Sequence, residues 1–523
     1  MAMTTTTVRD ETFRLLRELG MTTIFGNPGS TELLMFRGFP ADFRYILGLQ
    51  ESIVVGMADG YAQARRNAAF VNLHSAVGVG HAMGNLFTAY RNRTPLVVTA
   101  GQQSRSLMLM EPFLYATQAT ELPKPYVKWA CEPACAQDVP AAIARAYHIA
   151  MQPPCGPAFV SVPIDDWDQP ARAVEPKQVS TRVRAAEEDV LALATALDAS
   201  RKPVFIVGGA VDRDGAWDDV VRLAERHGAL VWVSPLIGRC GFPEDHPLFA
   251  GHLPAFREEI AKRLDGHDLL VALGAPLFTY HAEGRGPYVP HGLLAFQVTE
   301  DPEWAAAALA GRSLLASVGP TVKELLARSA RAAPAAQTGR KRAPVLAPEQ
   351  PIRASFLMQA LARVRSPDAI VVEEAPSSRG DMQSYLPIVR AETFYTCSSG
   401  GLGHGLPAAV GIAIAKPASK VISLLGDGSA MYSIQALWTA AQLALPITFV
   451  IVNNGRYEAL EHFAQRFDLP QTVGTQLGGI DFVALARSLG CGGVRVDDAA
   501  ALEGVLATAL AEPKPTLVEV RVG

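Results

Sequence analysis

Short apolar runs that end in glycine or polar residues recur along the whole chain. In the first third they lie at residues 22–25, 45–49, 69–73 and 96–100. Runs of this length suit strands that are buried on both faces, as in a parallel sheet, and the segments between them suit helices. This alternation predicts a doubly wound α/β domain in which polar residues gather just past the strand ends.

The same alternation repeats in two later blocks. Apolar runs lie at residues 203–207, 230–233, 269–273 and 293–298, then at residues 369–372, 393–396 and 421–425, with a last run closed by Asn453. No G-x-G-x-x-G follows the first run of the middle block, so dinucleotide binding there is poorly supported. Residues 170–188 and 331–351 lack periodicity and indicate linkers. We therefore predict an α/β protein with three doubly wound parallel-sheet domains, at residues 1–178, 183–335 and 345–523.

Composition excludes several functional classes. The chain has 523 residues and a net charge of −4, and no basic stripe or charge block suggests binding to nucleic acid or to a membrane surface. The sequence has no secretory signal pattern and no apolar stretch of membrane-spanning length. Its six cysteines are scattered, which is typical of free thiols in a reducing compartment. We expect a cytoplasmic protein with no nucleic-acid and no membrane partner.

The strongest chemical motif pairs GDGS at residues 426–429 with NNG at residues 453–455. Each follows an apolar run, and the segment between them suits one helical crossover and a strand, so both loops should emerge at the same edge of a sheet. That edge is where open α/β sheets bind ligands. The glycines let a phosphate approach the backbone, and Asp427 and Asn454 carry the oxygen ligands that Mg²⁺ prefers.

Glu51 is the most informative acid in the first block. It follows the run at residues 45–49 and begins a predicted helix, so one interpretation is a carboxylate that only stabilises the helix dipole. A functional carboxylate is favoured because GNPGS at residues 26–30 and His74 end neighbouring strands of the same predicted sheet.

These motifs resemble thiamine-diphosphate-dependent enzymes of the decarboxylase and acetohydroxyacid-synthase type, and most closely the benzoylformate-decarboxylase branch of that family. The matching segments run from about residue 10 to the C-terminus: FGNPGS, DFRYILGLQE, ADGYAQA, NLHSAVG, TAGQQSR, GGLGHGLPAAVG, GDGSAMYSIQALWTAAQ and NNGRYEAL. The resemblance implies an N-terminal pyrimidine-binding domain, a middle domain and a C-terminal domain that binds diphosphate and metal.

The resemblance also implies two cofactors, thiamine diphosphate and Mg²⁺, with Ca²⁺ as an alternative metal. The implied metal ligands are Asp427, Asn454 and the backbone carbonyl of Arg456. Glu51 would bond a pyrimidine nitrogen, and Leu402 would wedge between the two rings of the cofactor. The implied cofactor-binding residues are Glu51, Asn27, Gly400, Leu402, Gly428, Ser429, Tyr457 and Ser377.

The implied activity is non-oxidative decarboxylation of a small-molecule 2-oxo acid, aromatic or medium-sized, to an aldehyde and CO₂. Histidine exchanges protons near neutral pH, which suits His74 and His281 to proton transfer at the substrate, while Ser30 would anchor its carboxylate. The implied catalytic residues are Glu51, His74, His281 and Ser30. The implied substrate-pocket residues are Ser30, Leu114, Thr396, Leu460 and Phe463.

If Glu51 and Asp427 belong to different sheets, one cofactor must bridge two domains. In the family the bridged domains come from different chains, so the resemblance implies a homodimer at least, and a homotetramer as the expected assembly. Two alternatives stay open on the sequence. One is carboligation to 2-hydroxy ketones with the same cofactor, and the other is a non-catalytic nucleotide- or flavin-binding protein.

Overall fold

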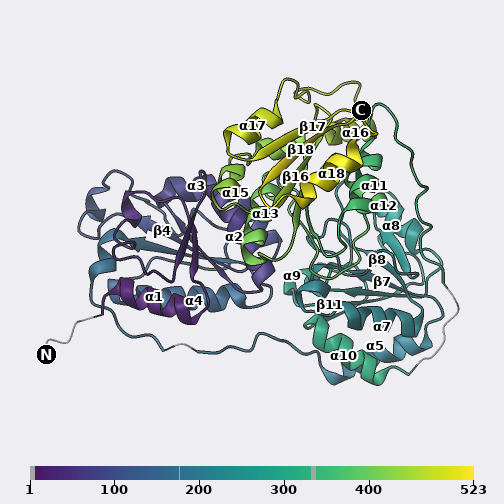
Figure 1. The fold of residues 1–523 in the computed structure, drawn as a ribbon. Coiled ribbons are helices and arrows are strands. Elements are labelled where there is room, and N and C mark those ends of the chain that lie inside the picture. Colours follow the sequence, from purple (N-terminus) through teal and green to yellow (C-terminus); the bar gives the residue numbers. More distant parts are fainter. Residues whose placement is uncertain (1–5, 176, 331–336) are drawn as a thin grey trace.

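Three α/β domains follow one another along the chain (Figure 1). The computed structural model describes residues 6–175, 177–330 and 337–523. Each domain contains one sheet of six strands, and all the strand pairs within the sheets are parallel. The predicted fold class, three doubly wound parallel-sheet domains, is therefore confirmed.

The first and third sheets share one strand order, and the middle sheet has another. The first sheet has the order β2-β1-β3-β4-β6-β5, with β1 (Thr23–Gly26), β2 (Arg44–Leu47), β3 (Ala69–Leu73), β4 (Leu96–Gln102), β5 (Ala130–Cys131) and β6 (Pro157–Pro163). The middle sheet has the order β12-β11-β10-β7-β8-β9, with β7 (Pro203–Val207), β8 (Leu230–Val233), β9 (Phe249–His252), β10 (Leu269–Leu273), β11 (Leu294–Thr299) and β12 (Arg312–Leu315). The third sheet has the order β14-β13-β15-β16-β18-β17, with β13 (Ile370–Glu374), β14 (Phe394–Thr396), β15 (Val421–Gly426), β16 (Ile447–Asn453), β17 (Gly492–Val496) and β18 (Thr516–Arg521).

Helices connect the strands and cover the sheets. The first domain contains α1 (Val8–Glu18), α2 (Glu51–Arg65), α3 (Ser75–Arg91) and α4 (Val139–Met151). The middle domain contains α5 (Glu187–Ala199), α6 (Gly209–Arg213), α7 (Trp217–His227), α8 (Arg257–Leu264), α9 (Pro302–Ala306) and α10 (Val318–Arg328). The third domain contains α11 (Ala354–Val364), α12 (Arg379–Tyr385), α13 (Gly405–Ala415), α14 (Asp427–Met431), α15 (Ala436–Gln442), α16 (Glu458–Arg466), α17 (Phe482–Ser488) and α18 (Leu502–Ala511).

Alternate residues of each strand bury opposite faces of the sheet. In the first sheet Phe25 and Val71 belong to one apolar core, while Ile24 and Phe70 belong to another. Both faces are covered, which explains why the strands read as continuous apolar runs. Removing water from these side chains stabilises the fold by roughly 25 cal/mol per Å² of apolar surface buried.

The crossover between GDGS and NNG differs from the single helix predicted. It contains two short helices, α14 and α15, before β16. The first ends because Tyr432 and Ser433 donate to carbonyls three residues back, which tightens the last turn. Both loops nevertheless emerge at the same edge of the sheet, because β15 and β16 pair in parallel.

Most described residues of the two predicted linkers lack helix and strand, but α5 begins at Glu187, inside the first of them. The described residues of 171–186 and 337–353 contain neither helix nor strand. Residues 331–336, and with them the predicted boundary at residue 335, lie outside the described residues. The sheets fall inside the predicted ranges 1–178, 183–335 and 345–523, and the domain boundaries themselves stay predictions. No helix in the described part of the chain is long and apolar enough to cross a membrane.

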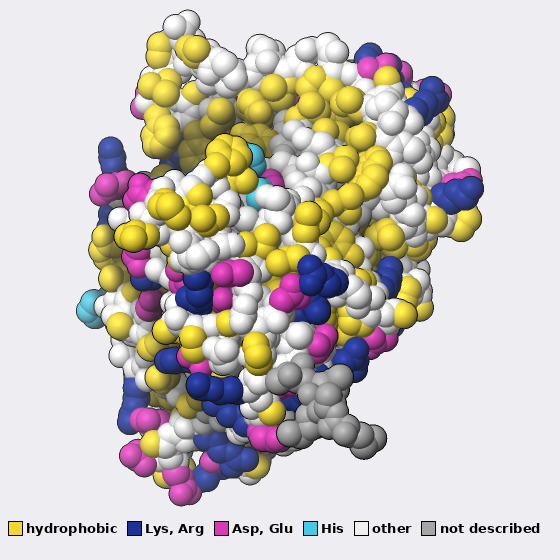
Figure 2. Space-filling model, turned by 90° about the vertical axis from the view of Figure 1, so that its left-hand side faces the viewer, with side chains coloured by type: hydrophobic (Ala, Val, Ile, Leu, Met, Phe, Trp, Pro, Cys, Tyr) yellow, Lys and Arg dark blue, Asp and Glu magenta, His cyan; other side chains and the backbone are white. Residues whose placement is uncertain are grey.

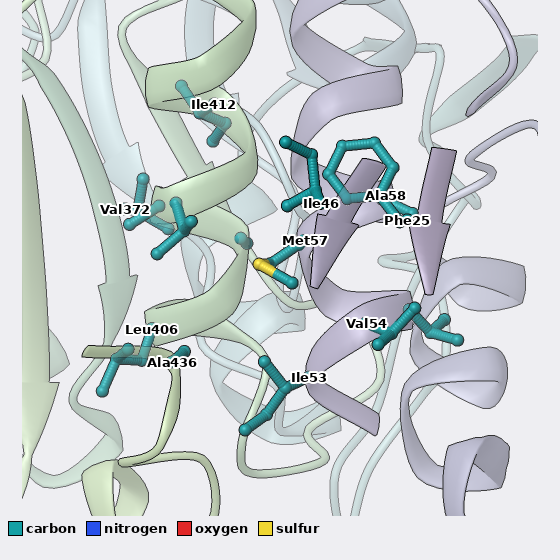
Figure 3. Packing of buried hydrophobic residues seen from close by; sticks show 14 of the residues in the cluster. Phe25, Ile46, Ile53, Val54, Met57, Ala58, Val372, Leu406, Ile412 and Ala436 are labelled. Atoms are coloured by element: carbon teal, nitrogen blue, oxygen red, sulfur yellow. The ribbon is translucent and has the colours of Figure 1, made fainter. Parts of the chain in front are cut away.

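The first and third domains are joined through α2 and α13, which lie side by side (Figure 3). A Cβ added to Gly60 of α2 would lie 2.2 Å from the carbonyl oxygen of Ala408, and one added to Gly411 of α13 would lie 1.9 Å from that of Met57. Glycine is therefore required at both positions for the two backbones to approach this closely. Apolar side chains of both domains form one continuous core across this contact.

Candidate active site

Asp427 is the first residue of α14, directly after β15. Its carboxylate accepts hydrogen bonds from the backbone N–H groups of Gly428 and Gly455, both at 2.7 Å. Burial raises the pKa of Asp427, and these N–H donors oppose that rise. Among the described residues no basic side chain forms an ion pair with this carboxylate, which is only 4% exposed. A buried carboxylate without a counter-charge is the kind of group that a bound cation stabilises.

Two further oxygen donors lie on the neighbouring loop after β16. The side-chain oxygen of Asn454 accepts a hydrogen bond from the N–H of Arg456 at 3.1 Å, and Arg456 itself forms an isolated bridge with Gln476. No group of three or more His, Cys, Asp or Glu side chains in the described ranges could hold a metal. One carboxylate with two carbonyl oxygens is a different donor set, and it fits a hard cation such as Mg²⁺.

A cavity of about 420 Å³ opens beside these loops. It is lined by residues of the middle and C-terminal domains: His281, Ala375, Pro376, Ser377, Ser378, Gly400, Leu402, Gly426, Asp427, Gly428, Ser429, Tyr432, Val452, Asn454, Arg456, Tyr457, Ala459, Leu460 and Phe463. Most of the predicted cofactor and metal residues thus surround one space. Tyr457 packs on Gly428 so closely that a Cβ there would lie 2.3 Å from its ring.

The loop before α13 contributes to the lining of this cavity. Leu402 lies between Gly400 and Gly403, whose φ values of +73° and +94° belong to the left-handed region that favours glycine. The Gly403 N–H donates to Glu374 at the end of β13. Leu402 thus lines the cavity, and its predicted role as a wedge between the two rings of a cofactor stays a prediction.

Glu51 lies in the N-terminal domain, as the first residue of α2. Its two oxygens are separately engaged: Asn27 donates to Oε1 at 3.1 Å, and His81 Nδ1 lies 3.1 Å from Oε2. The carboxylate is nearly buried, with Glu51 8% exposed. Asn27 was predicted at this site, whereas His81 was not.

His74 lies at the end of the next strand in the sequence, β3, as the residue before α3. Its Nδ1 lies 2.9 Å from an oxygen of buried Glu32 and 3.1 Å from the hydroxyl of Thr31. Glu32 also accepts the N–H groups of Gly29 and Gly101. A Cβ on Gly29 would lie 2.1 Å from the imidazole, so glycine is what allows the ring to lie here. The Glu32 carboxylate therefore fixes the orientation of His74.

The predicted substrate residues divide into three groups. His281, Leu460 and Phe463 meet at the cavity, where the His281 and Phe463 rings are 4.5 Å apart at an interplanar angle of 62°. Exposed Ser30 and half-buried Leu114 belong to the N-terminal domain, where the Leu114 carbonyl accepts a hydrogen bond from Ser75 next to His74.

Thr396 forms the third group, because it does not line this cavity. Its buried hydroxyl donates to Glu373 at 2.8 Å, and the residue lines a second, smaller cavity between the middle and C-terminal domains. Its assignment to the substrate pocket gains no support from this placement and stays a prediction.

Sequence reasoning missed three supporting residues: Glu32, His81 and Glu374. Glu32 lies just past GNPGS, and Glu374 ends an apolar run, so position alone could have marked both as candidates. Nothing in the sequence indicated that His81 would bond Glu51, because the pairing depends on how α3 packs against α2.

Comparison with known proteins agrees with this geometry. Three family descriptions match the chain: "Thiamine pyrophosphate enzyme, N-terminal TPP binding domain" over residues 6–120, "Thiamine pyrophosphate enzyme, central domain" over residues 190–325, and "Thiamine pyrophosphate enzyme, C-terminal TPP binding domain" over residues 377–520. The chain is 44% identical over 522 residues to benzoylformate decarboxylase of Pseudomonas aeruginosa, covering 98% of each protein.

Solved structures give the same result. The chain is 39% identical to benzoylformate decarboxylase from Polynucleobacter necessarius, with a TM-score of 0.97 over 99% of this chain and 98% of that one. It is 41% identical to a thiamine diphosphate-dependent 4-hydroxybenzoylformate decarboxylase of Rhodococcus jostii RHA1, with a TM-score of 0.95 over 99% of both chains. The resemblance found in the sequence is confirmed, and the non-catalytic alternative gains no support. The chain belongs to the thiamine pyrophosphate enzyme family and is a carboxy-lyase close to benzoylformate decarboxylase.

Proposed function

We propose that the protein catalyses the thiamine-diphosphate- and Mg²⁺-dependent, non-oxidative decarboxylation of an aromatic or medium-sized 2-oxo acid to an aldehyde and CO₂. One observation carries this proposal. A single cavity brings the oxygen donors of Asp427 and Asn454 together with His281 and with an apolar wall formed by Leu460 and Phe463. A metal–diphosphate site and a substrate site would thus share one space.

The oxygen donors at one end of the cavity suit the charged part of the cofactor. Asp427, Asn454 and the Arg456 carbonyl would hold Mg²⁺, and Gly428 and Ser429 line the same cavity, where a diphosphate would lie. When bound, thiamine diphosphate supplies a ring that accepts the electron pair released as CO₂ leaves. The protein's own contribution is to place proton donors and acceptors beside that ring.

Glu51 suits the pyrimidine end of the cofactor. Asn27 and His81 each hold one of its oxygens, so the carboxylate keeps one orientation toward a ring nitrogen. His74, oriented by Glu32, and His281, against Phe463, are the groups suited to proton transfer at the substrate.

We further propose that each site is completed by a second copy of the chain. The residues lining the cavity come from position 281 onward, whereas Glu51 and His74 lie in the first domain. Both domains also carry exposed apolar side chains. These are Leu109 (96% exposed) and Phe113 (86%) on the N-terminal domain, and Val473 (87%) on the C-terminal domain. Figure 2, which looks onto the N-terminal side, shows hydrophobic side chains gathered around a hollow. Such patches mark surfaces that another protein covers, and a dimer or a tetramer built from dimers would cover them.

The wall of the cavity supports a substrate with an apolar side group. Leu460 and Phe463 lie on one face of α16, three residues apart, next to His281. Solved structures named as a benzoylformate decarboxylase and a 4-hydroxybenzoylformate decarboxylase share the whole fold with this chain. A phenyl-bearing 2-oxo acid is accordingly our first choice of substrate. Carboligation uses the same cofactor and stays an untested prediction.

The proposal is tested by incubating the purified protein with thiamine diphosphate, Mg²⁺ and a panel of 2-oxo acids while measuring released CO₂. We expect release that requires both cofactors and is fastest with a phenyl side group. Release that is independent of thiamine diphosphate, or none from any 2-oxo acid, would overturn the proposed function.

A further inference from the structure

A buried polar network connects the N-terminal domain to the loop that carries Leu402. His404, fully buried just before α13, places Nε2 2.6 Å from an oxygen of Asp59 in the middle of α2. The same carboxylate accepts hydrogen bonds from Gln63 at 2.9 Å and Asn92 at 2.8 Å. Burial alone would raise the pKa of Asp59, but the adjacent His404 and the hydrogen bond from Gln63 lower it. Burial would lower the pKa of His404, and the Asp59 carboxylate raises it.

The remaining contacts hold the backbone of the loop from both sides. From the N-terminal domain, Asn92 accepts a hydrogen bond from Ser398 N–H at 2.8 Å, Thr88 bonds Ser399 at 2.9 Å, and Asn85 donates to the Gly403 carbonyl at 3.2 Å. From the C-terminal domain, the buried Glu374 carboxylate accepts N–H bonds from Gly403, His404 and Gly405 at 2.5 to 2.7 Å.

These anchors belong to the same helices that present the catalytic groups. Glu51 begins α2 and His74 directly precedes α3, whereas Asp59 and Asn92 lie at the middle of α2 and just past the end of α3. Eight residues separate Glu51 from Asp59, which is about 12 Å along a helix. The start of each helix and its later residues therefore contact different parts of the molecule.

We propose that Asp59, together with His404 and Glu374, is a positioning residue that holds the 398–405 loop in the shape that presents Leu402 to the cofactor. This rests on the proposed function and its shared sites. Each N-terminal domain then acts on two sites: the starts of its helices complete the partner's site, while their bodies shape the site of their own chain.

The proposal makes a specific prediction for Asp59→Asn, which keeps the size of the side chain. Loss of the charge loosens the loop, so binding of thiamine diphosphate with Mg²⁺, measured by calorimetry, should weaken and kcat should fall, each by about tenfold. The KM for the 2-oxo acid should change little. His404→Gln should behave in the same way, and it serves as the second variant if Asp59→Asn assembles poorly.

Complementation distinguishes this role from a general structural one. Two differently tagged chains are co-expressed, and assemblies carrying both tags are purified. When Asp59→Asn is mixed with Glu51→Gln, one of the two shared sites combines an intact Glu51 with an intact loop, so about half of the wild-type rate should return. When Asp59→Asn is mixed with Asp427→Asn, one shared site carries the loosened loop and the other carries the altered metal ligand. Neither site is intact, so no recovery is expected.

A matched pair separates failure of this proposal from failure of the proposed function. Glu51→Gln mixed with Asp427→Asn should recover activity whether or not Asp59 positions the loop. If that pair recovers and neither Asp59→Asn nor His404→Gln recovers with Glu51→Gln, the positioning role is wrong. If wild-type protein does not decarboxylate, or if the matched pair fails to recover, the proposed function or its shared site is wrong instead.

Discussion

The N-terminal and C-terminal sheets have the same strand order but carry different chemistry at their edges. After the second strand, the first sheet has Glu51 and the third has the Leu402 loop. After the third strand, the corresponding residues are His74 and Asp427. After the fourth strand, Asn454 of the third sheet has no counterpart among the candidate site residues. One topology thus offers equivalent positions, and under the proposed function the residue type at each would decide between proton transfer and metal binding.

The comparison extends to the helices. α2 and α13 each follow the second strand of their sheets, and they pack on one another through Gly60 and Gly411. In one chain α2 and α13 thus lie between the first and third sheets (Figure 1). The proposed shared site requires the strand ends that carry Glu51 and Asp427 to face different copies of the protein.

The largest effect is expected at the metal end. Asp427→Asn keeps the shape of the side chain but removes the buried charge that a cation would neutralise, so kcat/KM should fall by about 10³-fold or more. Binding of thiamine diphosphate with Mg²⁺, measured by calorimetry, should weaken in parallel. Asp497→Asn, at an exposed side chain, is the matched control and should leave both quantities unchanged. Equal losses in the two variants would remove Asp427 from the metal site.

A smaller and different effect is expected at the acid of the first sheet. Glu51→Gln should lower kcat roughly 100-fold, because proton transfer through the cofactor's pyrimidine depends on this carboxylate. Cofactor affinity should stay close to that of the wild type, and the exchange of the cofactor's thiazolium C2 proton, followed by NMR, should slow. Glu18→Gln on α1 is the control. Unaltered exchange in the Glu51 variant would contradict its catalytic role.

Glu32→Gln tests whether the Glu32 carboxylate orients His74 at the edge of the first sheet. The amide still fills the site but no longer orients the imidazole as a carboxylate does, so kcat should fall about tenfold and its pH profile should shift. His74→Ala should cost more than Glu32→Gln, and Glu121→Gln at an exposed position should change nothing. A fall in kcat with an unshifted pH profile would reduce Glu32 to a structural residue.

The smallest effect is expected at the apolar wall. Leu460→Ala widens the cavity beside Phe463 without touching the metal loops. The ratio of kcat/KM for a phenyl-bearing over a small aliphatic 2-oxo acid should fall by only a fewfold, because burial of one or two methylene groups contributes about 1 kcal/mol. An unchanged ratio would place the substrate's side group elsewhere.

Much of this comparison could be predicted from the sequence. Strands β3, β7, β8 and β10 match the predicted runs to the residue, because both faces of a parallel strand are apolar. The GDGS and NNG loops meet at one cavity because β15 and β16 pair in parallel, so both loops emerge at the same edge of the sheet. The two-residue strand β5 is too short to carry a periodic pattern, and the order of strands in a sheet is a property of packing rather than of the runs.

The residues that could not be predicted depend on contacts between distant segments. Glu32 reaches His74 only because Gly29 leaves room for the imidazole, and His81 reaches Glu51 across two helices. Thr396 ends β14 close to the Leu402 loop in sequence, yet its hydroxyl bonds Glu373 of the neighbouring strand. The pairing of Asp59 with His404, 345 residues apart, could be found only in the folded chain.

The central claim is that one site takes its acid from one chain and its metal ligands from another. The most direct test measures CO₂ release from doubly tagged assemblies of Glu51→Gln and Asp427→Asn chains, each of which should retain a hundredth or less of the wild-type rate alone. Shared sites predict about half of the wild-type rate, because one of two sites receives both intact groups. No recovery in stable mixed assemblies, or full activity in either variant alone, would contradict the account.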